Sequence, residues 1–260
     1  MDMTKQTEAH VKSIERALLI VDALAEAPRE HSLTQLANTL GWPKSTVHGV
    51  LSTLVQYRYV EQSAQTGRYR LGVRFFELGV KVGKMWDIRS VAMPHMQKLN
   101  AELGEMVQLG TEDHGEILYL EKLDSTHLIR IVSEIGGRLP IHCTGLGKAM
   151  LAYMPQAKRK RILREKGMPS YTPNTITSQA ALERELDGIR ERGFAIDDGE
   201  IMLGLRCVAA PIFDANGQVN YSLSVSCMQG NLEGDRLEKA ARRVMRAAEA
   251  ISQEWKQLSF

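Results

Sequence analysis

Three serines alternate with apolar residues near the carboxyl end of the sequence. Ser222, Ser224 and Ser226 occupy every second position, so in a β-strand their hydroxyls would all leave one face. Such hydroxyls can donate hydrogen bonds to a ligand, and a serine beside a base can act as a nucleophile. The pattern admits a polar pocket or a hydrolytic site, although a serine stripe most often forms an exposed sheet face.

The start of a predicted helix over 144–153 is a second polar element. Thr144 is a favourable N-cap, and Gly145 and Gly147 leave the amides of the first turn unshielded. Those amides and the positive end of the helix dipole favour a carboxylate. The Gly-x-Gly-Lys fragment lacks the four-residue gap and the Ser or Thr of a phosphate loop. We therefore expect carboxylate binding here and no nucleotide site.

Two further features are expected to converge on this helix end. Asp197 and Asp198 follow a predicted strand that begins at Phe194, and they precede a glycine. Cys207 begins an apolar strand that runs to Phe213. An Asp-Asp-Gly run is usually only a turn, so these residues add to the pocket hypothesis without deciding it.

A small-molecule hydrolase is the alternative that these residues raise. The sequence has no Gly-x-Ser-x-Gly elbow, and Ser224 and Ser226 lie within a strand rather than on a sharp turn. The candidate bases, His127 and His142, have no nucleophile paired with them, and a structural hydrogen bond is expected for His142. We therefore predict a ligand pocket without catalysis, with no cofactor and no metal.

The first eighty residues have the spacing of a helix-turn-helix. Apolar periodicity predicts helices over 11–27, 32–40 and 43–57, with Ser32 as an N-cap and Gly41 in the intervening turn. Purely structural helix bundles share this spacing, so it does not by itself establish DNA binding.

The exposed face of the third helix supports DNA binding, because no Asp or Glu occurs between Pro43 and Tyr59. A solvated face usually mixes both signs of charge, whereas a face that meets phosphates and base edges excludes acids. The residues that we expect to contact DNA here are Pro43, Lys44, Ser45, Thr46, His48, Gly49 and Ser52.

Two arginines follow in a predicted hairpin. Arg68 and Arg70 occupy alternate positions of a strand over 68–71, after a turn-prone segment over 63–67. As the wing of a winged helix they would reach phosphates or the minor groove. The alternative is that they are exposed arginines that protect an edge strand from aggregation.

Charge and composition separate the two parts of the chain. Of its 260 residues, 43% are hydrophobic and 25% charged, as in a folded soluble protein. Residues 1–89 hold 12 basic against 9 acidic residues, and residues 90–260 hold 21 against 22. A polyanion partner is therefore expected for the first part only. No membrane span or signal peptide is predicted, and three cysteines fit a reducing, cytoplasmic compartment.

The rest of the chain mixes helices and strands without regular βαβ alternation, which favours an α+β fold. Helices are expected over 73–88, 91–103 with an early interruption at Pro94, 156–166, 178–192 and 235–256. Strands are expected over 107–109, 117–120, 128–134 and 218–227, with hairpin turns at 112–115 and 214–217.

The sequence resembles a known family over nearly its whole length. The runs 13–18, 43–48 and 67–72 resemble the amino-terminal domain of IclR-type transcriptional regulators, and the run 137–149 resembles the effector-domain signature of the same family. One departure is Gly49, where the family often has arginine, so a DNA contact commonly made there is expected to differ.

The resemblance implies a winged helix-turn-helix over 10–72, a linker helix over 73–89 and a GAF-like α+β effector domain over 90–260. It implies an effector pocket lined by Leu128, Leu139, Gly145, Leu146, Asp197, Cys207, Ser224 and Ser226. It also implies a homodimer or a homotetramer, with dimer contacts from linker residues such as Phe75, Phe76, Leu78 and Val82.

Together these observations predict a cytoplasmic regulator, not an enzyme, that represses transcription. Its expected partners are a palindromic double-stranded DNA operator and a small organic acid, aliphatic or aromatic. An architectural DNA-binding protein without an effector is the remaining alternative to the hydrolase and the regulator.

Overall fold

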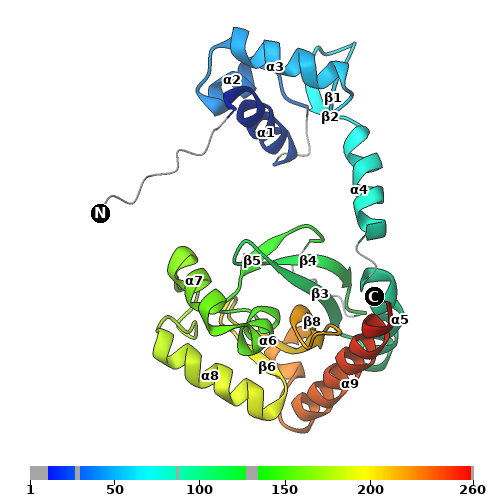
Figure 1. The fold of residues 1–260 in the computed structure, drawn as a ribbon, viewed down its shortest axis with the longest axis vertical. Helices are drawn as coiled ribbons and strands as arrows, with labels where there is room; N and C mark the ends of the chain where they lie inside the picture. Colours follow the sequence, from blue (N-terminus) through cyan, green and yellow to red (C-terminus); the bar gives the residue numbers. More distant parts are fainter. Residues whose placement is uncertain (1–10, 27–29, 86–87, 127–133, 259–260) are drawn as a thin grey trace. The chain divides into compact units, whose positions relative to one another are not determined.

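The computed structural model describes residues 11–26, 30–85, 88–126 and 134–258, and the chain divides into two compact units, Met1–Trp86 and Asp87–Phe260. Each unit has its own hydrophobic core, and its helices and strands are drawn in Figure 1. Within the described residues, no helix is long and apolar enough to cross a membrane.

The first unit is a winged helix-turn-helix. Helices α1 (Lys12–Ala25), α2 (Leu33–Leu40) and α3 (Lys44–Gln56) precede an antiparallel hairpin of β1 (Val60–Gln62) and β2 (Tyr69–Leu71). The helices and the hairpin share one core, whose buried members are Ile20, Leu24, Leu36, Ala37, Val47, Leu51, Val60 and Tyr69.

The residue types at the ends of α2 and α3 explain how the turn between these helices forms. Ser32 caps α2 through a capping box with Gln35, and Gly41 ends the helix in the left-handed conformation at φ 66°. Pro43 is the N-cap of α3, where its missing N–H costs no hydrogen bond. The predicted cap at Ser32 and the predicted turn at Gly41 are confirmed, whereas Pro43, expected in the first turn of the third helix, is its N-cap.

Helix α4 (Arg74–Met85) follows the hairpin within the first unit. Phe75 packs edge-to-face on Tyr59, with ring centroids 5.3 Å apart, so this residue is committed to the unit's own packing. Phe76, by contrast, is 72% exposed, and Val82 is also exposed. Of the linker residues expected to make dimer contacts, these two are the ones that the unit itself leaves uncovered.

The second unit is built on one antiparallel sheet with strand order β5-β4-β3-β8-β7-β6. Its strands are β3 (Met106–Asp113), β4 (Glu116–Leu123), β5 (Arg138–Pro140), β6 (Ala195–Asp198), β7 (Leu205–Phe213) and β8 (Val219–Met228). The β3–β4 turn uses positive φ at His114 and Gly115, and the β7–β8 turn uses it at Gly217, as the hairpin signals predicted.

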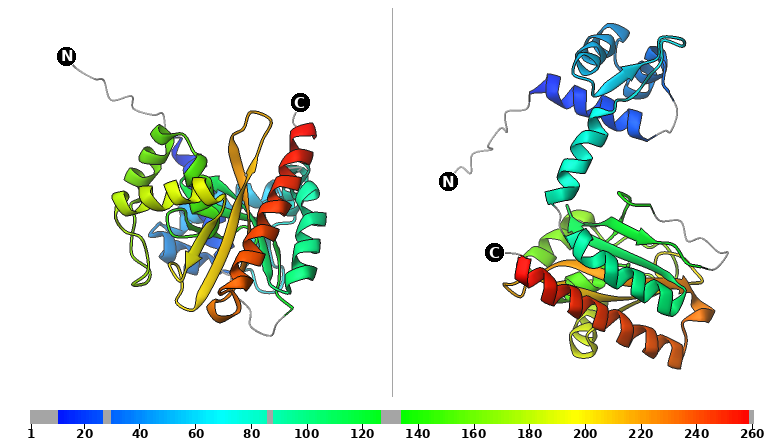
Figure 2. Two further views of the ribbon diagram at one scale, coloured as in Figure 1. Left: turned by 90° about the horizontal axis from the view of Figure 1, so that it is seen from below. Right: turned by 90° about the vertical axis from the view of Figure 1, so that its right-hand side faces the viewer.

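Helices cover both faces of this sheet (Figure 2). On one face lie α6 (Gly145–Tyr153), α7 (Gln156–Lys166) and α8 (Gln179–Arg192). On the other lie α5 (Ile88–Leu103) and α9 (Asp235–Leu258), which also pack on each other; a short 3-10 turn, η1 (Gln229–Asn231), leads from β8 toward α9. The α+β prediction is confirmed.

One prediction about local structure is wrong, one strand was not predicted, and one predicted strand lies mostly outside the described residues. Pro94 does not interrupt α5, which runs from Ile88 through it to Leu103. Strand β5 was not predicted, because three residues are too few for a periodic signal. Most of the strand expected over 128–134 lies outside the described residues, as does Leu128 itself.

Candidate functional site

The amino end of helix α6 is held rigidly against the sheet. Thr144 caps the helix by accepting a hydrogen bond from the Gly147 N–H at 3.2 Å, and its own hydroxyl donates to the Pro140 carbonyl at 2.9 Å. The first intrahelical bond runs from the Lys148 N–H to the Thr144 carbonyl, so the amides of Gly145 and Leu146 precede the helical ladder. A positive helix end with two available donors results.

A row of side chains crosses the sheet opposite this helix end. Asp197 on β6, Cys207 on β7 and Ser226 on β8 are successive cross-strand neighbours. On β3, the Gln108 amide oxygen accepts hydrogen bonds from Ser226 at 3.0 Å and from Ser224 at 3.4 Å. The serine stripe therefore faces one way, as predicted, but into the protein rather than toward solvent.

The helix end and this row enclose a cavity of about 90 Å³. Seven of the eight residues expected to line the effector pocket line this cavity: Leu139, Gly145, Leu146, Asp197, Cys207, Ser224 and Ser226. The eighth, Leu128, lies outside the described residues. Sequence reasoning did not foresee as lining residues Met106, Gln108, Tyr119, Thr144, Ile201, Met202 and Leu205.

Most of these unforeseen residues carry no signal of their own in the sequence. Gln108 is a single amide in an apolar strand, and only its register opposite Ser224 shows that it joins the serine row. Tyr119 lies on the same face, and its hydroxyl also interacts with the Gln108 side chain. Ser222, in contrast, does not line the cavity, because its hydroxyl donates to the Leu146 carbonyl at 3.1 Å and holds α6 in place.

Asp197 is the acidic group of the cavity. It is 1% exposed, and its Oδ1 accepts a hydrogen bond from the Glu200 N–H at 2.8 Å. Burial raises the pKa of Asp197 to about 7, which the hydrogen bonds from the Glu200 and Ile201 amides only partly offset. A carboxyl group of this kind can accept from a ligand hydroxyl or, when protonated, donate to one.

A buried ion pair lies beside this carboxyl group. The Lys148 ammonium, on α6, pairs with Glu200 and lies 3.8 Å from Glu185 on α8. Lys148 and Glu200 are 1% and 5% exposed, so the pair is held away from water. The lysine of the Gly-x-Gly-Lys fragment is therefore structural here and does not point to a phosphate.

The residues that the structure describes do not assemble a hydrolytic site. His142 is buried outside the cavity, its Nε2 lies 3.1 Å from the Pro169 carbonyl oxygen, and burial lowers the pKa of its ring. His127, the other candidate base, lies outside the described residues. The oxygen that Ser224 and Ser226 bond is an amide oxygen, which is no base. Among the described residues no histidine lines the cavity.

The three cysteines are buried thiols. Cys143, Cys207 and Cys227 are all unpaired, and burial raises the pKa of Cys143 and of Cys227 to about 12 and that of Cys207 well above its ordinary value. They pack as small apolar side chains, as expected. In the part of the chain that the structure covers, no cluster of His, Cys, Asp or Glu could hold a metal ion.

In the first unit, helix α3 presents the face that the sequence predicts. Val47 and Leu51 are buried in the core, so the opposite side of the helix faces solvent. The exposed residues of that side are Pro43, Lys44, Ser45, His48, Gly49 and Ser52, while Thr46 is half-buried. The exposed side of α3 thus presents two serines, one glycine and one imidazole to the place where a DNA groove would lie.

The wing holds its two arginines differently. Arg68 precedes β2 rather than lying within it, and its Nη1 donates to the Glu30 carbonyl at 3.5 Å. Arg70 donates from Nε and Nη2 to one oxygen of Glu61, at 3.1 and 3.0 Å, and thereby keeps the pKa of Glu61 below its usual value. Arg70 is therefore engaged in the unit itself, and Arg68 is the wing arginine without a carboxylate partner among the described ion pairs.

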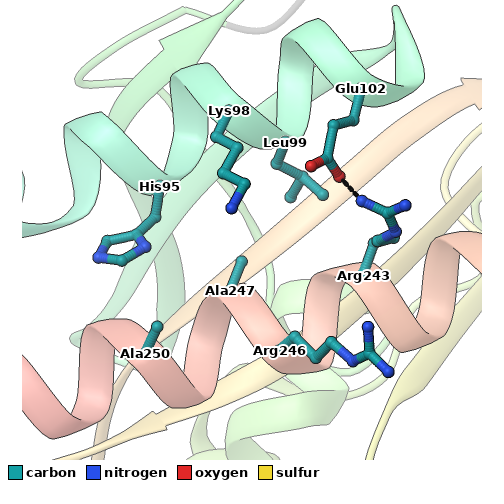
Figure 3. Close-up of a pocket in the computed structure, with 8 residues that line it drawn as sticks. All are labelled: His95, Lys98, Leu99, Glu102, Arg243, Arg246, Ala247 and Ala250. Carbon is teal, nitrogen blue, oxygen red and sulfur yellow. Dashed lines mark hydrogen bonds and ion pairs between the residues drawn. The ribbon is translucent and has the colours of Figure 1, made fainter.

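A second hollow lies on the other face of the second unit, between α5 and α9 (Figure 3). It measures about 250 Å³ and is lined by His95, Lys98, Leu99, Glu102, Arg243, Arg246, Ala247 and Ala250. Arg243 is paired with Glu102, and His95 with Glu254, while Lys98 and Arg246 have no carboxylate partner among the described ion pairs. None of the residues expected to bind an effector lies there.

The comparisons with known proteins match this architecture in both units. Residues 13–64 match the IclR helix-turn-helix domain, and residues 80–253 match the carboxyl-terminal domain of the bacterial transcriptional regulator IclR. The transcriptional repressor IclR of Escherichia coli is 32% identical over 96% of this chain and 92% of its own length. The transcriptional regulator KdgR of the same organism is 35% identical over 96% and 95%.

Solved structures agree with these relatives. The crystal structure of Thermotoga maritima IclR superposes with a TM-score of 0.80 at 30% identity, over 95% of this chain and all of that one. An IclR homologue from Microbacterium hydrocarbonoxydans, crystallised with 4-hydroxybenzoate, gives 0.83 at 26% identity over 95% and all of that chain. These relatives are regulators of transcription rather than enzymes. The chain described here belongs to the IclR family of DNA-binding transcriptional regulators.

Proposed function

We propose that this regulator represses transcription by binding a palindromic operator through α3 and the wing, and that a small organic acid in the α6 cavity modulates that binding. The observation that carries the DNA-binding part is the exposed, acid-free face of α3. The observation that supports the acid is the pair of available amides at the end of α6, which share the cavity with the polar side chains of Gln108, Ser224 and Ser226.

The occupant of the cavity follows from its chemistry. A carboxylate would accept from the Gly145 and Leu146 amides, and the hydroxyls of Ser224 and Ser226 would turn from Gln108 toward it. Leu139 and Leu146 bound the apolar part of the same cavity. The homologue crystallised with 4-hydroxybenzoate contains an aromatic carboxylate of this class.

A symmetric dimer would link DNA binding to ligand binding. One winged helix reads only a few base pairs, so a useful operator requires at least a dimer with half-sites about 34 Å apart or a multiple of that spacing. The uncovered Phe76 and Val82 of α4 would contribute to such a dimer. A ligand that favours one arrangement of the effector units would change the spacing of two α3 helices, and therefore the affinity for DNA.

We expect Lys44→Ala to weaken operator binding and to make it less sensitive to salt. Lys44 is exposed at the amino end of α3, where a lysine meets phosphate and releases a counterion on binding. The slope of log K against log salt concentration should fall by about one. Fluorescence anisotropy with a duplex from upstream of the regulator's own gene measures it, with Lys160→Ala on α7 as control. An unchanged slope would remove Lys44 from the phosphate contacts.

Gly49→Ala should strengthen the fold and weaken DNA binding. A glycine inside a helix costs about 0.5–1 kcal/mol relative to alanine. At Gly49 the backbone φ is not positive, and no atom lies within 4 Å of the Cβ that alanine would add, so nothing inside the unit requires glycine. We infer that in this regulator the duplex approaches the helix backbone at Gly49, in place of the contact that the arginine often found at this position would make, because only glycine lets a helix backbone lie closest to bases and phosphates.

The expected result for Gly49→Ala is a higher melting temperature together with operator affinity reduced about tenfold, or about 1.4 kcal/mol. Gly188→Ala is the matched control, because Gly188 lies inside α8 of the other unit, and the atom nearest to its added Cβ is the far end of the flexible Arg192 side chain at 3.4 Å. This control should gain stability without the loss on DNA. If Gly49→Ala binds its operator as tightly as the unchanged protein, close approach at this position is excluded.

A further inference from the structure

The charged groups behind the cavity do not balance. Lys148 and Arg192 are the cations of this cluster, and Glu185, Glu200 and Asp197 are its carboxylates. Lys148 pairs with Glu200, and Arg192 pairs with Glu185 at 2.5 Å. Asp197 is the carboxylate left over, and among the described residues no cation lies within 4 Å of it.

Among the described residues, the cation that acts on Asp197 is the Lys148 ammonium, which lowers the pKa of Asp197 but is itself paired with Glu200. Tyr119 on β4, Cys207 on β7 and Cys143 before α6 are electrostatically coupled to it, and burial raises the pKa of each, so all three stay neutral. Glu200 adds a negative charge. Asp197 is therefore a buried carboxyl group whose ionised form is poorly compensated.

The same carboxyl group lines the cavity into which the end of α6 would draw an anion. Two carboxylates within one buried site do not both ionise readily, because each raises the free energy of the other's charged form. A ligand carboxylate seated on the Gly145 and Leu146 amides would thus stabilise the protonated form of Asp197. The protonated carboxyl group gains an O–H donor, while its Oδ1 keeps the bond from the Glu200 amide.

We propose that the cavity binds its organic acid together with one proton from solvent, which resides on Asp197, so that occupancy by the acid falls as pH rises. This inference rests on the proposed carboxylate ligand and adds to it the partner proton. In this role Asp197 positions the ligand by donating a hydrogen bond from its neutral carboxyl group, not by accepting one as an anion.

The linkage has a definite sign. Below about pH 7 Asp197 is already protonated in the empty protein, so binding takes up no proton and the affinity does not change with pH. Above that value each bound carboxylate takes up one proton, and the dissociation constant should rise about tenfold for each pH unit. A neutral ligand of the same shape should not show this rise.

The experiment is calorimetric titration of the full chain with 4-hydroxybenzoate and with propionate, from about pH 6 to about pH 8.5, in buffers of different ionisation enthalpy. Propionamide, which has no group that titrates in this range, is the neutral counterpart of propionate. The expected result is uptake of about one proton near pH 8 for the acids and none for the amide. A ¹³C NMR titration of the Asp197 carboxyl group in the empty protein should show its midpoint near 7, far above that of an exposed aspartate.

Asp197→Asn removes the group that takes up the proton but keeps the shape of the cavity. Asparagine mimics the neutral acid and can still accept a hydrogen bond from the Glu200 amide. We expect this variant to bind 4-hydroxybenzoate without proton uptake and with little change over the pH range. Asp198→Asn is the matched control: Asp198 is the next residue of β6, pairs with Arg206 at 2.6 Å and does not line the cavity, so its variant should keep the proton linkage.

The outcomes of these experiments distinguish a failure of this inference from a failure of the proposed function on which it rests. Binding of the acids without proton uptake, or titration of Asp197 in the ordinary range of aspartate, overturns the inference and leaves the proposed function standing. Failure of every acid to bind even near pH 6 contradicts the carboxylate pocket itself, and the NMR midpoint then still decides whether Asp197 holds a proton.

Discussion

Replacing Gly147 with alanine should destabilise the second unit by about 3 kcal/mol or more, at the upper end of what overpacking a protein interior costs. The added Cβ would lie 2.0 Å from the carbonyl oxygen of Ile141 and 2.6 Å from its carbonyl carbon. Both are backbone atoms, so no rotation of a side chain relieves the clash. Either α6 moves from the sheet or the segment before it does, and the cap from Thr144 to the Gly147 amide is lost.

Thermal unfolding of the full chain measures this effect, with Gly145→Ala as the matched control. A Cβ on Gly145 would lie 3.4 Å from the Cβ atoms of Ala209 and Cys207, which is a tight but tolerable contact. The control should therefore stay folded and lose ligand affinity, because its methyl group enters the wall of the cavity. Wild-type stability of Gly147→Ala would show that the end of α6 is not packed as described.

Replacing Lys148 with methionine should cost about 3–5 kcal/mol, the usual penalty for removing one partner of a buried ion pair. Glu200 would then keep a buried negative charge, and one of its oxygens, Oε2, already has no hydrogen-bond partner. Burial raises the pKa of Glu200 even with lysine present, and removing the ammonium raises it further.

The destabilisation of Lys148→Met should depend on pH, because the raised pKa of Glu200 causes it. The folded protein then binds a proton at Glu200 that the unfolded chain releases near its ordinary pKa of 4.5. Stability therefore falls as pH rises above that value, and Lys148→Met should be less destabilised near pH 5 than near pH 8. The double variant Lys148→Met/Glu200→Gln removes both charges and should recover most of the loss. Equal losses in the single and double variants would mean that packing, rather than charge, is responsible.

The elements of this fold were largely accessible from the sequence because their signals are local. Ser32 with Gln35 caps α2, Gly41 supplies the positive φ after it, and Asp214 to Gly217 forms the expected hairpin turn. The continuity of α5 through Pro94 was not accessible, because packing against β3 and α9 outweighs the bond that proline removes. The short strand β5 is likewise set by its pairing with β4.

Some residues of the candidate site could likewise be predicted from the sequence, and others could not. The capped glycines of α6 and the serine alternation are sequence patterns, so the polar side chains of the cavity could be anticipated. Gln108 and Tyr119 could not, because only the register of β3 with β8 and of β4 with β3 brings them to the same face. The pairing of Arg70 with Glu61 is also a matter of register and distinguishes this arginine from Arg68.

Footprinting of the DNA upstream of the regulator's own gene tests the central claim most directly. The account predicts two protected half-sites related by a dyad, with centres about 34 Å or a multiple of that apart, at protein concentrations that leave a scrambled duplex unprotected. Uniform protection that simply spreads with concentration would indicate an architectural protein that reads no sequence. Absence of protection even at low ionic strength would contradict the assignment of α3 to a DNA groove.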